Sequence, residues 1–118
     1  HQSFADPAAI ALLRRYNVAL VTADTAAWSY LDVTADFAYL RLQGAPGADH
    51  YDEAGLDRWA ARRRAVAAGE PLADGPLVGA PADRQPRDVF AYFVSTDKVH
   101  APRNARAVMQ RLGLEPPA

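Results

Sequence analysis

Charged side chains lie at the ends of three short apolar runs, where they could bind or transform a ligand. The runs and their side chains are 18–23 with Asp24, 37–42 with Arg41, and 89–94 with Asp97. Carboxylates can accept protons or help to hold a divalent cation, and a guanidinium can bind an anion. If these runs are parallel strands, their carboxyl ends meet at one edge of the sheet, which is where α/β proteins bind ligands.

Arg41 is the strongest single candidate. Side chains alternate along a strand, so Phe37, Tyr39 and Arg41 share one face, and we expect the guanidinium to point to the inside of a closed sheet. A buried guanidinium is costly unless it is paired. Two interpretations therefore stay open: Arg41 contacts an anionic ligand, or it forms a fixed ion pair with Asp24 or Asp97 that only braces the fold.

Asp24 also has two interpretations. It follows a run rich in β-branched residues, and in a ligand site it could accept a proton or help to bind a cation. Alternatively, it caps the next turn through Thr25 or a backbone N–H.

The elements that must position these side chains alternate between helix and strand. Asp6 and Asp52 are suitable helix N-caps, Pro7 and Pro102 suit the first turn of a helix, and Gly113 suits a helix end. The sequence predicts helices over 7–16, 53–68 and 102–112, and strands over 18–23, 37–42 and 89–94. In the second predicted helix, the spacing of Leu56, Trp59 and Ala60 places them on the face that packs against the core. The basic run 62–64 is expected to form a solvated face.

The apolar runs are typical of strands buried on both faces, and the fold class is therefore α/β with parallel strands and flanking helices. Residues 69–87 are rich in proline and glycine and are expected to form a loop within one domain. A sheet of three strands leaves unpaired N–H and C=O groups at both edges. We expect further residues or a partner chain to complete it into a larger sheet or a barrel.

Composition excludes several functions. The 118 residues carry 13 basic and 14 acidic side chains, a net charge of −1, which disfavours nucleic acid as a partner and with it a DNA-repair enzyme. Without cysteine there are no disulfides or thiolate sites. No apolar run approaches the roughly 20 residues of a membrane helix, so we expect no membrane partner and a cytoplasmic protein. No motif identifies a cofactor, and no spacing of histidines and carboxylates predicts a metal site.

Five segments resemble the DUF72 (YecE-like) family in their order and spacing. They are His1–Phe4, Thr34–Gly44, Leu56–Ala60, Asp88–Phe93 and Ala101–Ala105. The resemblance implies a TIM-barrel-like (β/α) fold of which 1–118 is the C-terminal portion, the N-terminal half being absent. It also places His1 at the end of a preceding strand, where an imidazole could act as an acid or base. The family has no established biochemical activity.

The chain departs from the family pattern at two positions. Gln43 replaces the usual histidine, and an amide can hydrogen-bond a ligand but cannot transfer a proton. Ser95–Asp97 stands where many members carry a pair of asparagines. Tyr51 either closes over the pocket or is a surface aromatic.

These residues give one predicted site and two functional hypotheses. The catalytic candidates are His1, Asp24 and Arg41; the ligand-binding candidates are Gln43, Tyr51 and Asp97. The leading hypothesis is an enzyme-like barrel that binds a small polar or anionic ligand, such as a sugar or a phosphate, at the strand ends. The alternative is a non-catalytic interaction module, with Arg41 sealed in ion pairs and an apolar sheet surface used by a partner chain. The sequence leaves open whether the protein is an enzyme.

Overall fold

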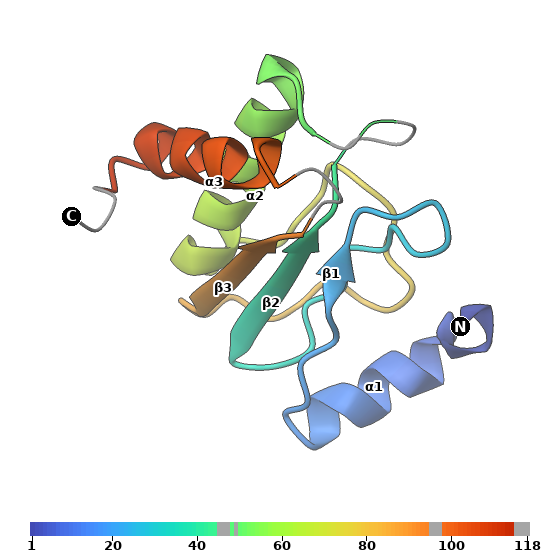
Figure 1. Ribbon diagram of the computed structural model, residues 1–118. Helices are drawn as coiled ribbons and strands as arrows, with labels where there is room; N and C mark the ends of the chain where they lie inside the picture. Colours follow the sequence, from blue (N-terminus) through green and yellow to red (C-terminus); the bar gives the residue numbers. More distant parts are fainter. Residues whose placement is uncertain (45–47, 49, 95–97, 115–118) are drawn as a thin grey trace.

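The computed structural model of the chain describes residues 1–44, 48, 50–94 and 98–114 (Figure 1). Its order of helix, strand, strand, helix, strand, helix is the predicted one, preceded by a short 3-10 helix. The elements are η1 (Gln2–Phe4), α1 (Pro7–Arg15), β1 (Thr22–Ala23), β2 (Phe37–Leu42), α2 (Glu53–Ala68), β3 (Asp88–Phe93) and α3 (His100–Arg111).

The helices begin and end where local chemistry allows. The side chains of Asp6 and Asp52 accept hydrogen bonds from the first turns of α1 and α2. Gly69 ends α2 in the left-handed conformation, with φ 84°. Helix α3 begins at His100, before the predicted start at Pro102, because proline is tolerated in a first turn. Within the described residues, no helix is long and apolar enough to cross a membrane.

The three strands form one parallel sheet in the order β1-β2-β3. Leu40 in the middle strand is paired with Thr22 on one side and Ala91 on the other. Strand β2 has its predicted bounds, but the strand predicted over 18–23 is reduced to Thr22–Ala23. The reason is Thr34, whose hydroxyl donates to the carbonyl of Val18 and accepts from the amide of Leu20. A side chain thus takes the place of a neighbouring strand.

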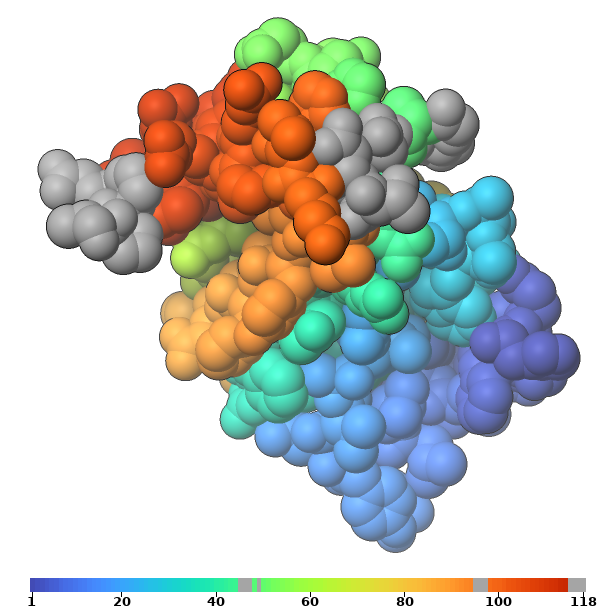
Figure 2. Space-filling model, in the orientation of Figure 1, coloured from blue at the N-terminus to red at the C-terminus, as the bar shows by residue number. Residues whose placement is uncertain are grey.

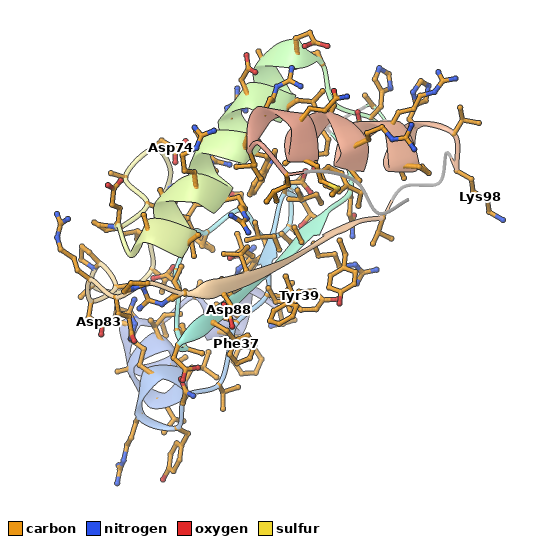
Figure 3. The ribbon with its side chains drawn as sticks, turned by 90° about the vertical axis from the view of Figure 1, so that its left-hand side faces the viewer. Phe37, Tyr39, Asp74, Asp83, Asp88 and Lys98 are labelled. Carbon is orange, nitrogen blue, oxygen red and sulfur yellow. The ribbon has the colours of Figure 1, made fainter. Side chains whose placement is uncertain are left out.

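The two faces of the sheet have different surroundings. Helices α2 and α3 pack on one face, over side chains such as Leu40 and Leu42. Figure 3 shows Phe37 and Tyr39 on the side away from these helices. In Figure 2 the side chains of β3, β2 and β1 form a continuous surface facing the viewer. We call this surface the open face.

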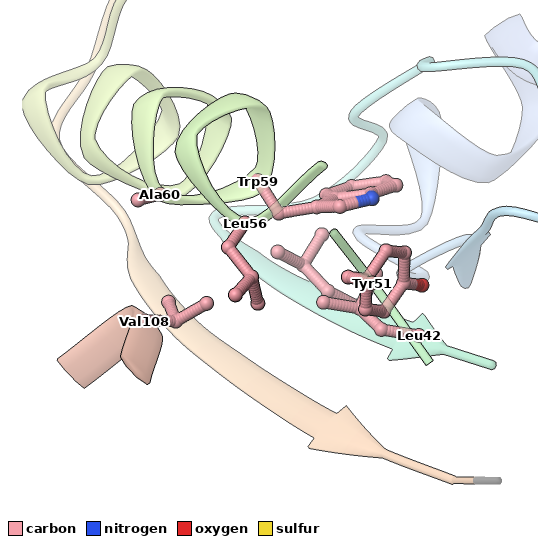
Figure 4. Close-up of a cluster of buried hydrophobic side chains, with 7 residues drawn as sticks. Leu42, Tyr51, Leu56, Trp59, Ala60 and Val108 are labelled. Carbon is pink, nitrogen blue, oxygen red and sulfur yellow. The ribbon is translucent and has the colours of Figure 1, made fainter. Parts of the chain in front are cut away.

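The core lies between the sheet and the two helices. One cluster of buried side chains, shown in Figure 4, joins β2 to both helices and to the segment before α2. Its members are Leu40, Leu42, Tyr51, Leu56, Trp59, Ala60 and Val108. A second cluster gathers around Val66 of α2, under the loop that follows this helix. The predicted burial of Leu56, Trp59 and Ala60 is confirmed.

The loop between α2 and β3 is fixed by two buried charged side chains. The carboxylate of Asp32, 1% exposed, accepts hydrogen bonds from the amides of Val78 and Gly79 at 2.8 and 2.9 Å. Arg87, also buried, donates to the carbonyl of Ala35 at 2.9 Å and forms an ion pair with Asp83 at 2.8 Å. Both charges are satisfied, and they hold the loop against the segment that leads into β2.

Candidate functional site

A pocket of about 460 Å³ lies on the open face, at the carboxyl ends of β1 and β2. Three of the predicted site residues line it together: His1, Arg41 and Gln43. Apolar side chains that include Phe4, Val21 and Trp28 form its other walls, from η1 and from the segments on either side of β1. We call this the Arg41 pocket.

The guanidinium of Arg41 is exposed, contrary to the expectation of a buried group. The alternation argument placed it correctly beside Phe37 and Tyr39, but nothing among the described residues covers that face. Within the described part of the chain no hydrogen bond or ion pair involves its guanidinium, so the fixed ion pair with Asp24 does not form. Asp97, the other proposed partner, lies outside the described residues. Arg41 lines the pocket, and the five N–H donors of its guanidinium have no partner among the described residues.

His1 and Gln43 complete the polar lining of the Arg41 pocket. The amide of Ser3 donates to Nδ1 of His1 at 3.2 Å, and the Ser3 hydroxyl lies 2.8 Å from the same nitrogen. A neutral imidazole that accepts at Nδ1 carries its proton on Nε2. Gln43 is fixed through its backbone amide, which donates to Asp24 Oδ1 at 2.9 Å.

Asp24 and Tyr51 line a different pocket, of about 510 Å³. It lies between the end of β1, the start of α2 and the turn at residues 74–76. The strand register explains this separation. Ala23 is paired with Arg41, so the next residue, Asp24, points to the opposite, helix-covered side of the sheet. We call this the Asp24 pocket. Ala23 and Thr25 line both pockets.

The carboxyl of Asp24 is only half satisfied. Its Oδ1 accepts a hydrogen bond from the backbone amide of Gln43, which follows β2. The backbone N–H that it binds therefore comes from the neighbouring strand's end, and not from the next turn, as one of the two interpretations expected. Its Oδ2 is buried and has no hydrogen-bond partner in the described part of the chain. Burial raises the pKa of this carboxyl above 3.8. The backbone amides of Gln43, of Asp24 itself and of Gly44 oppose the rise, as does the positive charge of Arg62.

Tyr51 is 7% exposed, so the interpretation as a surface aromatic is wrong. Its ring packs edge-on against Phe93, with centroids 6.2 Å apart, and belongs to the main core cluster. Its hydroxyl is buried and has no hydrogen-bond partner among the residues that the structure describes.

Arg62 is a member of the Asp24 pocket that the sequence prediction missed. Its guanidinium lies 4.6 Å from the ring centroid of Trp59 and pairs with Asp74 at 3.0 Å. Its side chain is only 14% exposed, so it does not belong to a solvated basic face. The spacing from Trp59 to Arg62 is the signal that could have found it, because residues i and i+3 are neighbours on a helix.

No group of three or more His, Cys, Asp or Glu side chains that could hold a metal ion occurs within the described residues. His50 and His100 stack with ring centroids 4.6 Å apart, and neither lines the two pockets.

A parallel sheet with helices packed on one face and pockets at its carboxyl edge defines a β/α protein, in an arrangement that fits part of a β/α barrel. The family model described as "Protein of unknown function DUF72" matches residues 1–118, and the chain belongs to this family. No curated protein and no solved structure matches the chain.

Proposed function

We propose that this chain is the C-terminal portion of a β/α barrel and that the Arg41 pocket, at the barrel mouth, binds a small anionic ligand. The observation that carries the proposal is the exposed guanidinium of Arg41, which no described residue pairs. Ligand sites of β/α barrels lie at the carboxyl ends of the strands, which is the edge where Arg41 lies.

The other polar groups of the Arg41 pocket suit the same ligand. Gln43 supplies an amide that can donate or accept, and Nε2 of His1 can donate to an oxygen atom. Guanidinium binds carboxylate and phosphate groups through paired hydrogen bonds, which fix the orientation of the ligand as well as its charge. A carboxylate or phosphate ester with a small body fits a pocket of about 460 Å³.

Phosphate titration tests the proposal. With the protein at its full natural length, we expect inorganic phosphate to bind in the millimolar range by calorimetry. Arg41→Ala should weaken this binding about ten- to a hundredfold, because a hydrogen bond to a charged group contributes about 1.5–3 kcal/mol. Arg41→Lys keeps the charge but loses the paired donors, so its affinity for phosphate should lie between that of the wild-type protein and that of Arg41→Ala.

The matched control is Arg106→Ala. Arg106 is an exposed arginine on α3 that lines neither pocket. The substitution should leave phosphate binding unchanged. Equal losses in the Arg41 and Arg106 variants would show that phosphate responds only to net charge, and the proposal would then fail.

The open face supports a second candidate function, an interaction module. Phe90 and Tyr92 are 49% and 48% exposed. Tyr92 stacks on Tyr39 and Phe90 contacts Phe37 edge-to-face, so the four rings form an aromatic surface. Such a surface favours a protein partner. The module hypothesis also required Arg41 to be sealed in ion pairs, and no described residue pairs with it.

Sedimentation distinguishes the two candidates. A module that covers its open face with a second copy sediments as a dimer, and Tyr92→Asp converts it to a monomer. Leu12→Asp, a control at an exposed apolar position on α1, leaves the dimer intact. A wild-type protein that sediments as a folded monomer at its full natural length favours the barrel.

A further inference from the structure

Two residues that line the Asp24 pocket each carry a buried polar atom that has no hydrogen-bond partner among the described residues. These atoms are Oδ2 of Asp24 and the hydroxyl of Tyr51. Buried polar atoms in folded proteins are nearly always hydrogen-bonded, because an unpaired one costs stability. Two such atoms on residues that line one pocket of about 510 Å³ indicate that a bound molecule supplies the missing partners.

Both atoms are held in place by the surrounding structure. The hydrogen bond from the Gln43 amide fixes the carboxyl of Asp24. The ring of Tyr51 is fixed by its packing in the core, and Figure 4 shows its hydroxyl directed away from Val108 and out of the apolar cluster. A ligand therefore meets groups whose rotamers are already restricted, which lowers the entropic cost of binding.

The charges that line the Asp24 pocket disfavour an anion. Three carboxylates and two guanidiniums contribute to the lining: Asp24, Asp52, Asp74, Arg58 and Arg62. The first turn of α2 is capped by Asp52, whose Oδ1 accepts from the amide of Gly55 at 2.8 Å, so a carboxylate already occupies this helix N-terminus. Arg62 is neutralised by Asp74. A cation would be repelled by the guanidinium of Arg58. A neutral ligand therefore fits this mixture of positive and negative charges best.

We propose that the Asp24 pocket binds a neutral polyhydroxylated molecule, a monosaccharide or a related polyol. One ligand hydroxyl donates to Oδ2 of Asp24, and a second exchanges a hydrogen bond with the hydroxyl of Tyr51. The apolar lining, which includes Trp59 and Leu31, can face the C–H groups of the ligand. This site lies on the opposite side of the sheet from Arg41 and does not depend on the anion site proposed above.

Polyol binding is tested by saturation-transfer NMR with D-glucose, myo-inositol and glycerol as probes, using the protein at its full natural length. We expect transfer to at least one of the three from the wild-type protein. Tyr51→Phe removes one hydroxyl and keeps the ring, and should raise the dissociation constant about two- to tenfold, the effect of one neutral hydrogen bond. Asp24→Asn, which keeps the side-chain shape, should have a comparable effect.

Two control variants separate this site from the rest of the molecule. Tyr92→Phe removes a tyrosine hydroxyl from the open face, and Arg41→Ala removes the anion-binding group; both should bind the polyol as the wild-type protein does. The proposal is overturned if none of the three polyols receives transfer from a folded wild-type protein, or if Tyr51→Phe binds them unchanged.

Discussion

The two faces of the sheet differ in what covers them more than in their hydrophobicity. On the face that packs against α2 and α3, Ala38, Leu40 and Leu42 are at most 4% exposed. On the open face, Phe90 and Tyr92 are half exposed although their aromatic rings are large and apolar. A strand sends alternate side chains to opposite sides, but it does not determine the layer that each side meets.

The same comparison separates the two pockets. Arg41 and Gln43 belong to the open face, and Asp24 and Tyr51 belong to the helix-covered side. One hydrogen bond, from the amide of Gln43 to Asp24, connects them. Neighbouring positions at the carboxyl edge therefore line two separate pockets, for which we propose an anion on one side of the sheet and a polyol on the other.

The largest expected effect on stability comes from a substitution that opens a cavity on the face of the sheet that α2 and α3 cover. Leu40→Ala should lower the free energy of unfolding of the 118-residue chain by about 2–5 kcal/mol, because the side chain is 2% exposed. Phe90→Ala should cost clearly less, about 1 kcal/mol, since half of its ring already meets water. Urea denaturation followed by far-UV circular dichroism measures both values.

The same pair of variants tests what covers the open face. If Phe90→Ala costs as much as Leu40→Ala in the protein at its full natural length, another segment packs on the open face, as the barrel proposal requires. A small cost at Phe90 there would contradict a closed barrel.

A smaller effect on the free energy of unfolding is expected when a buried polar atom without a described partner is removed. Tyr51→Phe should raise the free energy of unfolding by about 1 kcal/mol, because it removes an unpaired hydroxyl and keeps the ring packing. Tyr92→Phe, the matched change on the open face, should leave the stability unchanged within about 0.5 kcal/mol. A destabilised Tyr51→Phe variant would show that the hydroxyl has a partner in solution.

The smallest effect is a change in the pH dependence of stability. The pKa of Asp24 is raised in the folded protein, so this carboxyl favours folding at low pH and its contribution is lost as the pH rises from 3.8 through the raised pKa. Asparagine does not titrate. The stability of Asp24→Asn relative to the wild type should therefore increase over that window and then level off.

Urea denaturation at a series of pH values from below 3.8 to neutral measures this difference. A relative stability that decreases with rising pH would mean that Asp24 is stabilised as a carboxylate, and the unpaired Oδ2 would then need another explanation.

Local sequence signals predicted most of the secondary structure. The bounds of β2 and α2 and the cap at Asp6 follow from alternation, helical spacing and capping preferences, which act within a few residues. The prediction of the first strand was too long, because the group that binds residues 18–20 is Thr34, from a later segment. No local pattern reveals such a partner.

The amino-acid sequence by itself determined the order of the elements and the side of β2 on which Arg41 lies, since both depend on nearby residues. It also indicated that the strands are parallel, through the alternation of helix and strand and the apolar character of the strands. Only the tertiary structure decided that Asp24 and Arg41 line different pockets and that Tyr51 is buried. Those outcomes depend on the register between β1 and β2 and on the packing of α2, which bring together residues far apart in the chain.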